Sequence, residues 1–412
     1  MGSVLPFASA SAAILVSAAL WAVWRSRKSV LSRVRQNKPD QQVPLVSRGP
    51  LNVLDLIANT PIVYIRSLSD ATGCTVLGKA EFTNLGGSSK DRVALRIVRD
   101  AEANDLIRPH SNDTLFEGTV GRYLFYLMEL YSTGISLALV ARAKGYNCHI
   151  VMPDDQAQAK YDILNALGAT VEKVRPCSIV DENHFVNIAR RRAEEYTRAN
   201  QHLGPRGLFC DQFESESNFQ AHLHGTGPEI YKALGDKIDA FVMGAGTGGT
   251  LAGVASFLRP LIPGMNVVLA DPQGSGLHSK VKHNVLYSPF EREGSRRRHQ
   301  VDTIVEGIGQ NRWTRNLEKI FNEKLVDDSV KVTDEEALEM SRYVMENDGL
   351  FLGSSSSVNL VAAYRVAKAL PQGSTVLTIL CDSGTRHLQK FWHTGWLEEQ
   401  GLATKFGKSL SF

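Results

Sequence analysis

The alternation of short apolar runs with longer amphipathic runs after residue 50 most constrains the fold of this 412-residue chain. Short apolar runs are typical of buried strands, and amphipathic runs are typical of the helices that cover them. The predicted strands are Thr75–Glu81, Thr114–Glu117, His149–Pro153, Thr170–Val174, Leu208–Phe213, Ala240–Met243, Val267–Ala270 and Thr375–Cys381. The predicted helices are Asp91–Asn104, Ala159–Leu167, Phe185–Arg198, Pro228–Leu234, Glu335–Asn347 and Ser357–Leu370. The pattern predicts an α/β fold with mainly parallel sheets, in which ligands bind beyond the carboxyl ends of the strands.

An uncharged, mostly apolar run extends from Val4 to Trp24. A helix of about 20 apolar residues suffices to span a bilayer. Trp21 and Trp24 lie where an interfacial belt would place them, and a basic cluster follows, so the positive-inside rule keeps the rest of the chain in the cytosol. We expect residues 1–24 to form an uncleaved membrane-anchor helix. The alternative, a cleaved secretory signal, normally carries its positive charges before the apolar run.

Residues 25–50 are basic and polar, contain three prolines and show no periodic apolar pattern, which is typical of a linker. The formal net charge of the chain is +3, from 46 Lys and Arg against 43 Asp and Glu. Six of these basic residues and one acidic residue lie in the first 40 positions, so the remaining body is close to neutral. A nucleic-acid interface would need basic residues clustered on that body, and we expect no nucleic-acid partner.

The cysteines are odd in number and show no Cys-x-x-Cys spacing; they are Cys74, Cys148, Cys177, Cys210 and Cys381. This arrangement argues against a disulfide framework and against a zinc site, and it suits a reducing compartment. We therefore expect no metal.

The first motif that carries chemistry is the segment Asn84–Arg92, which follows a predicted strand and opens a predicted helix. Its two glycines allow tight turns, and Lys90 lies beside the positive end of the helix dipole. That environment favours a neutral amine, which can form an imine with a carbonyl cofactor. The alternative is a helix start with a surface lysine.

The second motif is the glycine-rich segment Gly244–Leu251, between an apolar strand and an apolar helix. Backbone N–H groups at such a helix start, together with the hydroxyls of Thr247 and Thr250, form a cup for phosphate. No Walker lysine is present, which argues against a nucleoside triphosphate and favours a single phosphate ester. Asp271 keeps a dinucleotide as a weaker alternative, and a plain structural turn is the other.

Two further polar segments follow strand-like runs: Gly353–Ser357 and Cys381–Arg386. Each is compatible with a plain turn. Together with the lysine and the phosphate cup, however, they meet the needs of pyridoxal phosphate. Its aldehyde needs an amine, its phosphate a cup, and its ring nitrogen a hydroxyl or carboxyl partner.

From about Leu54 to Trp392 the chain resembles the cysteine synthase and cystathionine β-synthase family of fold-type II pyridoxal-phosphate enzymes. Within that family it is most similar to fungal, membrane-tethered cysteine synthase-like proteins, which are often associated with mitochondria. Besides the motifs above, the stretches that carry the resemblance are Ile57–Ile62, Met152–Asp154, Asp211–Phe213, Gly225–Ile230 and Glu306–Gly309.

The resemblance implies a catalytic domain over residues 51–412 with two lobes and mainly parallel twisted sheets, the smaller lobe over about residues 97–200, and a homodimer. It also implies a reaction: loss of acetate from O-acetylserine, followed by addition of sulfide to give cysteine. Cysteine desulfhydration is the alternative activity. The implied location is the mitochondrial outer membrane, with the catalytic domain facing the cytosol.

The resemblance also implies roles for individual residues. Lys90 would bond the cofactor aldehyde and shuttle the α-proton. Ser355 would contact the pyridine nitrogen, with Asp382 as its rival or neighbour, and Ser132 would contact the ring hydroxyl. The phosphate would be held by Gly246, Thr247, Gly248, Gly249 and Thr250. The substrate carboxylate would be bound by Thr119, Gly121, Thr133 and Gln212.

The sequence departs from the family pattern at two places. Leu85 stands where the family has proline, and ten mostly large, apolar residues, 122–131, split the substrate loop between Gly121 and Ser132. Such an insertion is expected to displace Ser132 and Thr133 from Thr119. It has three interpretations: an artefact of the gene model, which the clean join of the flanking halves favours; an inactivating insertion that leaves a tethered binding protein; or a lid or docking patch.

Overall fold

The computed structural model describes residues 51–119, 131–155, 158–177, 179–202, 204–286, 303–309, 313–402 and 410–412. The predicted anchor 1–24, the predicted linker 25–50, Gly121 and residues 122–130 lie outside these described residues. Within them, no helix has the length and apolar character needed to cross a membrane.

The larger of two sheets has six strands in the order β1-β2-β10-β7-β8-β9. Strand β1 is antiparallel to β2, and every other pairing in this sheet is parallel. The strands are β1 (Ile62–Tyr64), β2 (Thr75–Ala80), β7 (Ala240–Gly244), β8 (Asn266–Pro272), β9 (Asp328–Val332) and β10 (Thr375–Leu380).

The second sheet has four parallel strands in the order β5-β4-β3-β6. These strands are β3 (Thr114–Gly118), β4 (Asn147–Pro153), β5 (Thr170–Val174) and β6 (Gly207–Phe209). The prediction of an α/β fold with mainly parallel sheets is thus confirmed.

Helices cover both faces of each sheet, as buried parallel strands require. The α-helices are α2 (Arg66–Thr72), α3 (Lys90–Ala103), α4 (Tyr131–Lys144), α5 (Gln158–Ala166), α6 (Phe185–Ala199), α7 (Glu216–Ala221), α8 (Gly227–Leu234), α9 (Gly249–Leu258), α10 (Leu277–His283), α11 (Arg315–Asn322), α12 (Asp334–Asp348), α13 (Ser354–Ala369) and α14 (Thr394–Glu399). The other turns are 3₁₀ helices η1 (Val53–Leu56), η2 (Glu81–Thr83) and η4 (Gly384–His387), and a π-helix, η3 (His222–Thr226).

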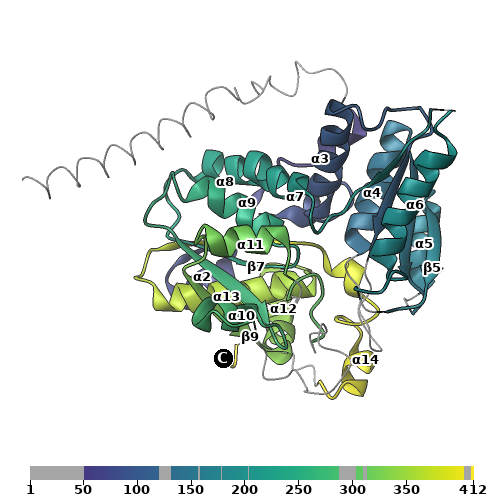
Figure 1. Cartoon of the computed structure of the whole chain (residues 1–412). Helices are drawn as coiled ribbons and strands as arrows, with labels where there is room; N and C mark the ends of the chain where they lie inside the picture. Colours follow the sequence, from purple (N-terminus) through teal and green to yellow (C-terminus); the bar gives the residue numbers. More distant parts are fainter. Residues whose placement is uncertain are drawn as a thin grey trace, which may run out of the picture.

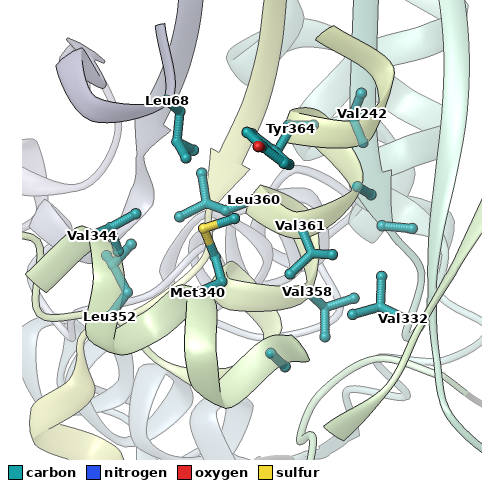
Figure 2. Close-up of a cluster of buried hydrophobic side chains, with 14 of the residues drawn as sticks. Leu68, Val242, Val332, Met340, Val344, Leu352, Val358, Leu360, Val361 and Tyr364 are labelled. Atoms are coloured by element: carbon teal, nitrogen blue, oxygen red, sulfur yellow. The ribbon is translucent and has the colours of Figure 1, made fainter. Parts of the chain in front are cut away.

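Separate apolar clusters hold the two sheets. In the small sheet, α3, α4 and α5 pack on one face and α6 on the other, and they form the body on the right of Figure 1. On one face of the large sheet, α13 lies at the centre, between the sheet and α12 (Figure 2). Its side chains Val358, Leu360 and Val361 are fully buried there. Helices α8, α9 and α11 cover the other face.

The structure differs from the prediction for the polar segment Gly353–Ser357. Gly353–Ser357 was expected to be a polar loop after a strand, with the helix beginning at Ser357. The structure begins α13 at Ser354, so all four serines lie in its first turn. In the strand-like run before it, Leu352 makes an isolated bridge with Ser383. The helix begins early because residues 354–357 are already buried against neighbouring segments, and tertiary packing overrides the weak helix propensity of serine.

Candidate active site

A cleft with about 540 Å³ of empty space lies at the carboxyl ends of β2, β7 and β10. It brings together eight residues that the sequence singled out: Lys90, Ser132, Gly246, Thr247, Gly248, Thr250, Ser355 and Asp382. Sequence reasoning had not assigned the remaining lining residues to the site: Ser88, Ser89, Met243, Gly244, Leu251, Gly307, Ile308 and Cys381.

Lys90 is the first residue of α3, and its neighbours in the chain are firmly anchored. The Asp91 carboxylate accepts hydrogen bonds from the backbone N–H of Gly86 (2.7 Å) and from Ser136 Oγ (2.5 Å). Burial raises the pKa of Asp91, although these hydrogen bonds oppose the increase. The glycine turn before Lys90 and helix α4 are thereby tied to the start of α3, which fixes the position from which the lysine extends.

Arg92 anchors the other side of Lys90 through a buried ion-pair network. Its guanidinium contacts Glu81 Oε2 at 2.7 Å and Glu229 Oε1 at 2.6 Å, and Lys79 Nζ lies 2.7 Å from Glu229 Oε2. Thr60 also donates to Glu81 at 2.7 Å. The network thus joins two of the stretches that carried the family resemblance, Ile57–Ile62 and Gly225–Ile230. Burial raises the pKa of Glu81, but Arg92, Thr60 and Lys79 together outweigh burial and lower this pKa to about 2, so Glu81 stays ionised.

The glycine-rich segment forms the start of α9 and faces the same cleft. Its N-cap residue, Gly248, has φ of 82° and offers no side chain to cap the helix. The first backbone N–H groups of α9 have no partner within the helix. That of Gly249 donates weakly to Thr247 Oγ1 at 3.4 Å, and a helix start of this kind can bind an anion. Gly246 is required for a different reason, because a Cβ there would lie 2.0 Å from the carbonyl oxygen of Gly307.

A buried histidine supports this helix start from behind. His222 Nε2 lies 3.0 Å from Thr250 Oγ1, and its Nδ1 lies 2.9 Å from Thr226 Oγ1. Burial lowers the pKa of His222 to about 3, so the imidazole is neutral. It can therefore donate to one of the threonines and accept from the other, which orients the Thr250 hydroxyl.

Asn218 connects the predicted substrate residues to the glycine-rich segment. Thr133 Oγ1 donates to Gln212 Oε1 at 2.5 Å. The Asn218 side-chain amide donates to the carbonyl of Gln212 (2.8 Å) and to Thr247 Oγ1 (2.9 Å). A Cβ on Gly249 would lie 2.0 Å from Asn218 Oδ1, so Gly249 admits this amide rather than lining the cleft. No local sequence pattern indicated Asn218.

The two halves of the split substrate loop meet in the structure. Thr119 is fully buried and donates its N–H to Val151 at 3.0 Å. Its Cγ2 lies 3.5 Å from the position of a Cβ built on Gly134, directly after Thr133. Of the predicted substrate residues, Thr119, Thr133 and Gln212 therefore lie near one another, whereas Gly121 lies outside the described residues.

The first turn of α13 presents one of its four serines to the cleft. Ser354 Oγ accepts from the N–H of Glu306 at 3.0 Å, and Ser356 Oγ accepts from the N–H of Cys381 at 2.8 Å. Ser357 Oγ donates to the carbonyl of Gly353 at 3.1 Å. Three hydroxyls are thus used to hold the backbone, and Ser355 is the serine that lines the cleft.

Arg386, which sequence reasoning assigned no role, bridges three segments of the site. Its Nη1 donates to Ser132 Oγ at 2.7 Å, and its Nη2 donates to the carbonyl of Gly86. It belongs to the loop after β10, so it ties that loop to the turn before Lys90 and to the first turn of α4. The contact is long-range in sequence, which is why the motif did not reveal it.

No group of three or more His, Cys, Asp or Glu side chains in the described residues is arranged to hold a metal ion. The donors in the cleft instead suit an organic cofactor. A lysine and an uncapped helix start that share one cleft at the carboxyl ends of parallel strands define a site for a phosphorylated carbonyl compound.

A family model described as "Pyridoxal-phosphate dependent enzyme" matches residues 53–382, and the chain belongs to this family. It is similar to "Cysteine synthase 2" of Neurospora crassa, with 57% identity over 82% of this chain and 72% of that protein. It is 50% identical to "Cysteine synthase 2" of Schizosaccharomyces pombe over 87% of each chain. The crystal structure of O-ureido-L-serine synthase is 30% identical, with a TM-score of 0.68 over 83% of this chain and 95% of that one.

Proposed function

We propose that this protein is a cysteine synthase that uses pyridoxal phosphate to replace the acetate of O-acetylserine with sulfide, giving cysteine. The observation that carries the proposal is that Lys90 and the start of α9 open into one cleft. The cysteine synthases among the similar proteins support the choice of substrates.

When bound, pyridoxal phosphate would withdraw electrons from the α-carbon of an amino acid, so that its proton can be removed and its β-substituent can leave. Lys90 Nζ would bond the cofactor aldehyde and, once released from it, would accept and return the α-proton. The N–H groups at the start of α9, with Thr247 and Thr250, would bind the phosphate. Ser355 Oγ would face the ring nitrogen as a neutral partner, which suits loss of a β-substituent rather than transamination.

The remaining groups would orient the substrate. Ser132 Oγ, already held by Arg386, would face the ring hydroxyl. Thr119, Thr133, Gln212 and Gly121 would bind the substrate carboxylate, and the contact between Thr119 and Gly134 supports their convergence in spite of the inserted residues. An oriented carboxylate places the α-proton within reach of Lys90, and orientation of this kind lowers the barrier without new chemistry.

Incubation of the purified protein with O-acetylserine and sulfide, or with cysteine alone, tests the proposal. We expect the first mixture to consume sulfide and form cysteine. Release of sulfide from cysteine as the faster reaction would identify a desulfhydrase instead. If the protein binds the cofactor but turns over neither mixture, the result would support the alternative that it is a tethered binding protein. In that case, a variant lacking residues 122–131 shows whether the insertion is the block.

We also propose that residues 1–24 anchor the protein in the mitochondrial outer membrane, that residues 25–50 link this anchor to a catalytic domain in the cytosol, and that the domain forms homodimers. A 50% identical relative in Saccharomyces cerevisiae is named "Putative mitochondrial cysteine synthase". The smaller lobe would comprise about residues 97–200, to which β6 adds Gly207–Phe209. We expect the full chain to remain with the membranes after an alkaline wash, and its catalytic domain to be digested by added protease. Recovery of the chain in the soluble fraction would contradict the anchor.

Replacing Arg386 with methionine is expected to lower kcat/KM for cysteine formation by about 10²-fold, because Ser132 and the turn before Lys90 lose their common donor. Steady-state kinetics measures the effect. The exposed Arg99, replaced in the same way, serves as the control. An unchanged kcat/KM in the Arg386 variant would show that the other contacts suffice to hold these segments.

A further inference from the structure

A histidine buried between two carboxylates lies directly behind the cleft. His387, in η4, is 1% exposed, and its partners Asp382 and Glu306 are 2% and 5% exposed. His387 Nε2 lies 3.1 Å from Asp382 Oδ2, and its Nδ1 lies 3.4 Å from Glu306 Oε2. The reaction described above assigns no role to His387 or Glu306.

The two carboxylates favour a positive charge on His387. Carboxylates only accept hydrogen bonds, and a neutral imidazole carries a single N–H. His387 Nε2 makes a hydrogen bond with Asp382, whereas its Nδ1 and Glu306 Oε2 approach to 3.4 Å without forming one. Two buried carboxylates flanking the ring favour the imidazolium, in which both nitrogens are protonated. One imidazolium then compensates one of the two buried negative charges. Among the described residues, Lys390 also interacts with Glu306: burial lowers the pKa of Lys390, while Glu306 and Asp155 oppose that decrease.

The cluster touches the segment that presents Ser355. A Cβ built on Gly353 would lie 2.2 Å from Asp382 Oδ1 and 2.4 Å from His387 Nε2, so the pair packs directly against the start of α13. Asp382 and Ser355 both line the cleft. Two groups of different acidity are therefore available near the proposed position of the ring nitrogen, and the one that reaches it decides whether that nitrogen carries a proton.

We propose that His387 is a positioning residue that holds the Asp382 carboxylate in an ion pair, so that the Ser355 hydroxyl is the partner of the cofactor's ring nitrogen. The inference rests on the proposed function, since it requires pyridoxal phosphate in the cleft. Without the imidazolium, the Asp382 carboxylate would lose the positive charge that lies 3.1 Å from it. A proton taken up from water onto the ring nitrogen would then be stabilised by that carboxylate.

The test uses the full chain reconstituted with pyridoxal phosphate that carries ¹⁵N in its ring, followed by NMR. We expect the wild-type protein to show the ring shift of unprotonated pyridoxal phosphate. The His387→Asn variant keeps a polar side chain without the charge, and its ring shift should move towards that of the protonated cofactor. The double variant His387→Asn/Asp382→Asn should return to the wild-type value. A His283→Asn variant, at an exposed histidine, serves as the control.

Each result of this experiment supports or overturns the proposed role of His387. An unchanged ring shift in His387→Asn, or a shift that Asp382→Asn does not reverse, would overturn the inference. If His387→Asn does not fold, the single variant Asp382→Asn decides: the wild-type shift supports Ser355 as the partner, and a displaced shift makes Asp382 the direct partner. A wild-type protein that binds the cofactor with a protonated ring also overturns the inference. A wild-type protein that binds no cofactor overturns the proposed function itself.

Discussion

Replacing Lys90 with alanine is expected to abolish cysteine formation, with a loss in kcat on the order of 10³-fold or more. The variant lacks both the amine that would bond the cofactor and the base that would move the α-proton, and loss of a general base alone typically costs 10²- to 10⁴-fold. Pyridoxal phosphate should also become removable by gel filtration, with loss of the absorption band of lysine-bound cofactor. Absorbance spectra before and after filtration, together with sulfide consumption, measure both effects.

The variant should remain folded, because Asp91 and Arg92, which it retains, supply buried contacts that fix the start of α3. An unchanged thermal unfolding midpoint would establish this. Lys237, an exposed residue between α8 and β7, is the matched control, and its replacement by alanine should leave the spectrum and the rate as they are. Retention of the lysine-bound absorption band in Lys90→Ala would place the cofactor on another lysine and contradict the assignment.

The sequence predicted those parts of the cleft that follow from local patterns. Lys90 and the segment Gly246–Thr250 each come after a predicted strand and begin a helix, and the carboxyl ends of parallel strands meet at one edge of a sheet. For Lys90 and the start of α9 to line one cleft, β2 and β7 therefore needed only to belong to the same sheet, with β10 between them.

The parts that the sequence did not predict depend on contacts between distant segments. Asn218 in α7 and His222 in the π-helix η3 belong to none of the motifs, and they act through Thr247 and Thr250. Arg386 was visible in a motif, but its partner Ser132 is 254 residues away. Strand β9 lacks a continuous apolar run, because it lies at the edge of its sheet and only Ser329 and Val332 of its residues are buried.

Replacing Arg92 with methionine is expected to destabilise the protein by about 3–5 kcal/mol at pH 7, since Glu81 would remain buried without its principal ion-pair partner. Urea unfolding followed by circular dichroism measures the loss. The double variant Arg92→Met/Glu81→Gln should lose less than the sum of the two single variants, because it removes the uncompensated charge. An additive loss would show that the two side chains contribute independently.

The destabilisation caused by Arg92→Met should become smaller as the pH falls. In the wild-type protein the pKa of Glu81 is about 2, against 4.5 for an ordinary glutamate. Its contribution, about 3 kcal/mol, is therefore fully present above about pH 4.5 and is lost as the pH falls towards 2. In Arg92→Met, burial instead raises the pKa of Glu81, so acidification relieves the buried charge. The difference in stability between wild type and variant should consequently narrow between pH 7 and pH 4. The exposed pair Arg108–Asp105 provides the control, because Arg108→Met should leave the free energy of unfolding unchanged at both pH values. If the loss of stability in Arg92→Met stayed constant between pH 7 and pH 4, an ionised Glu81 could not be its cause.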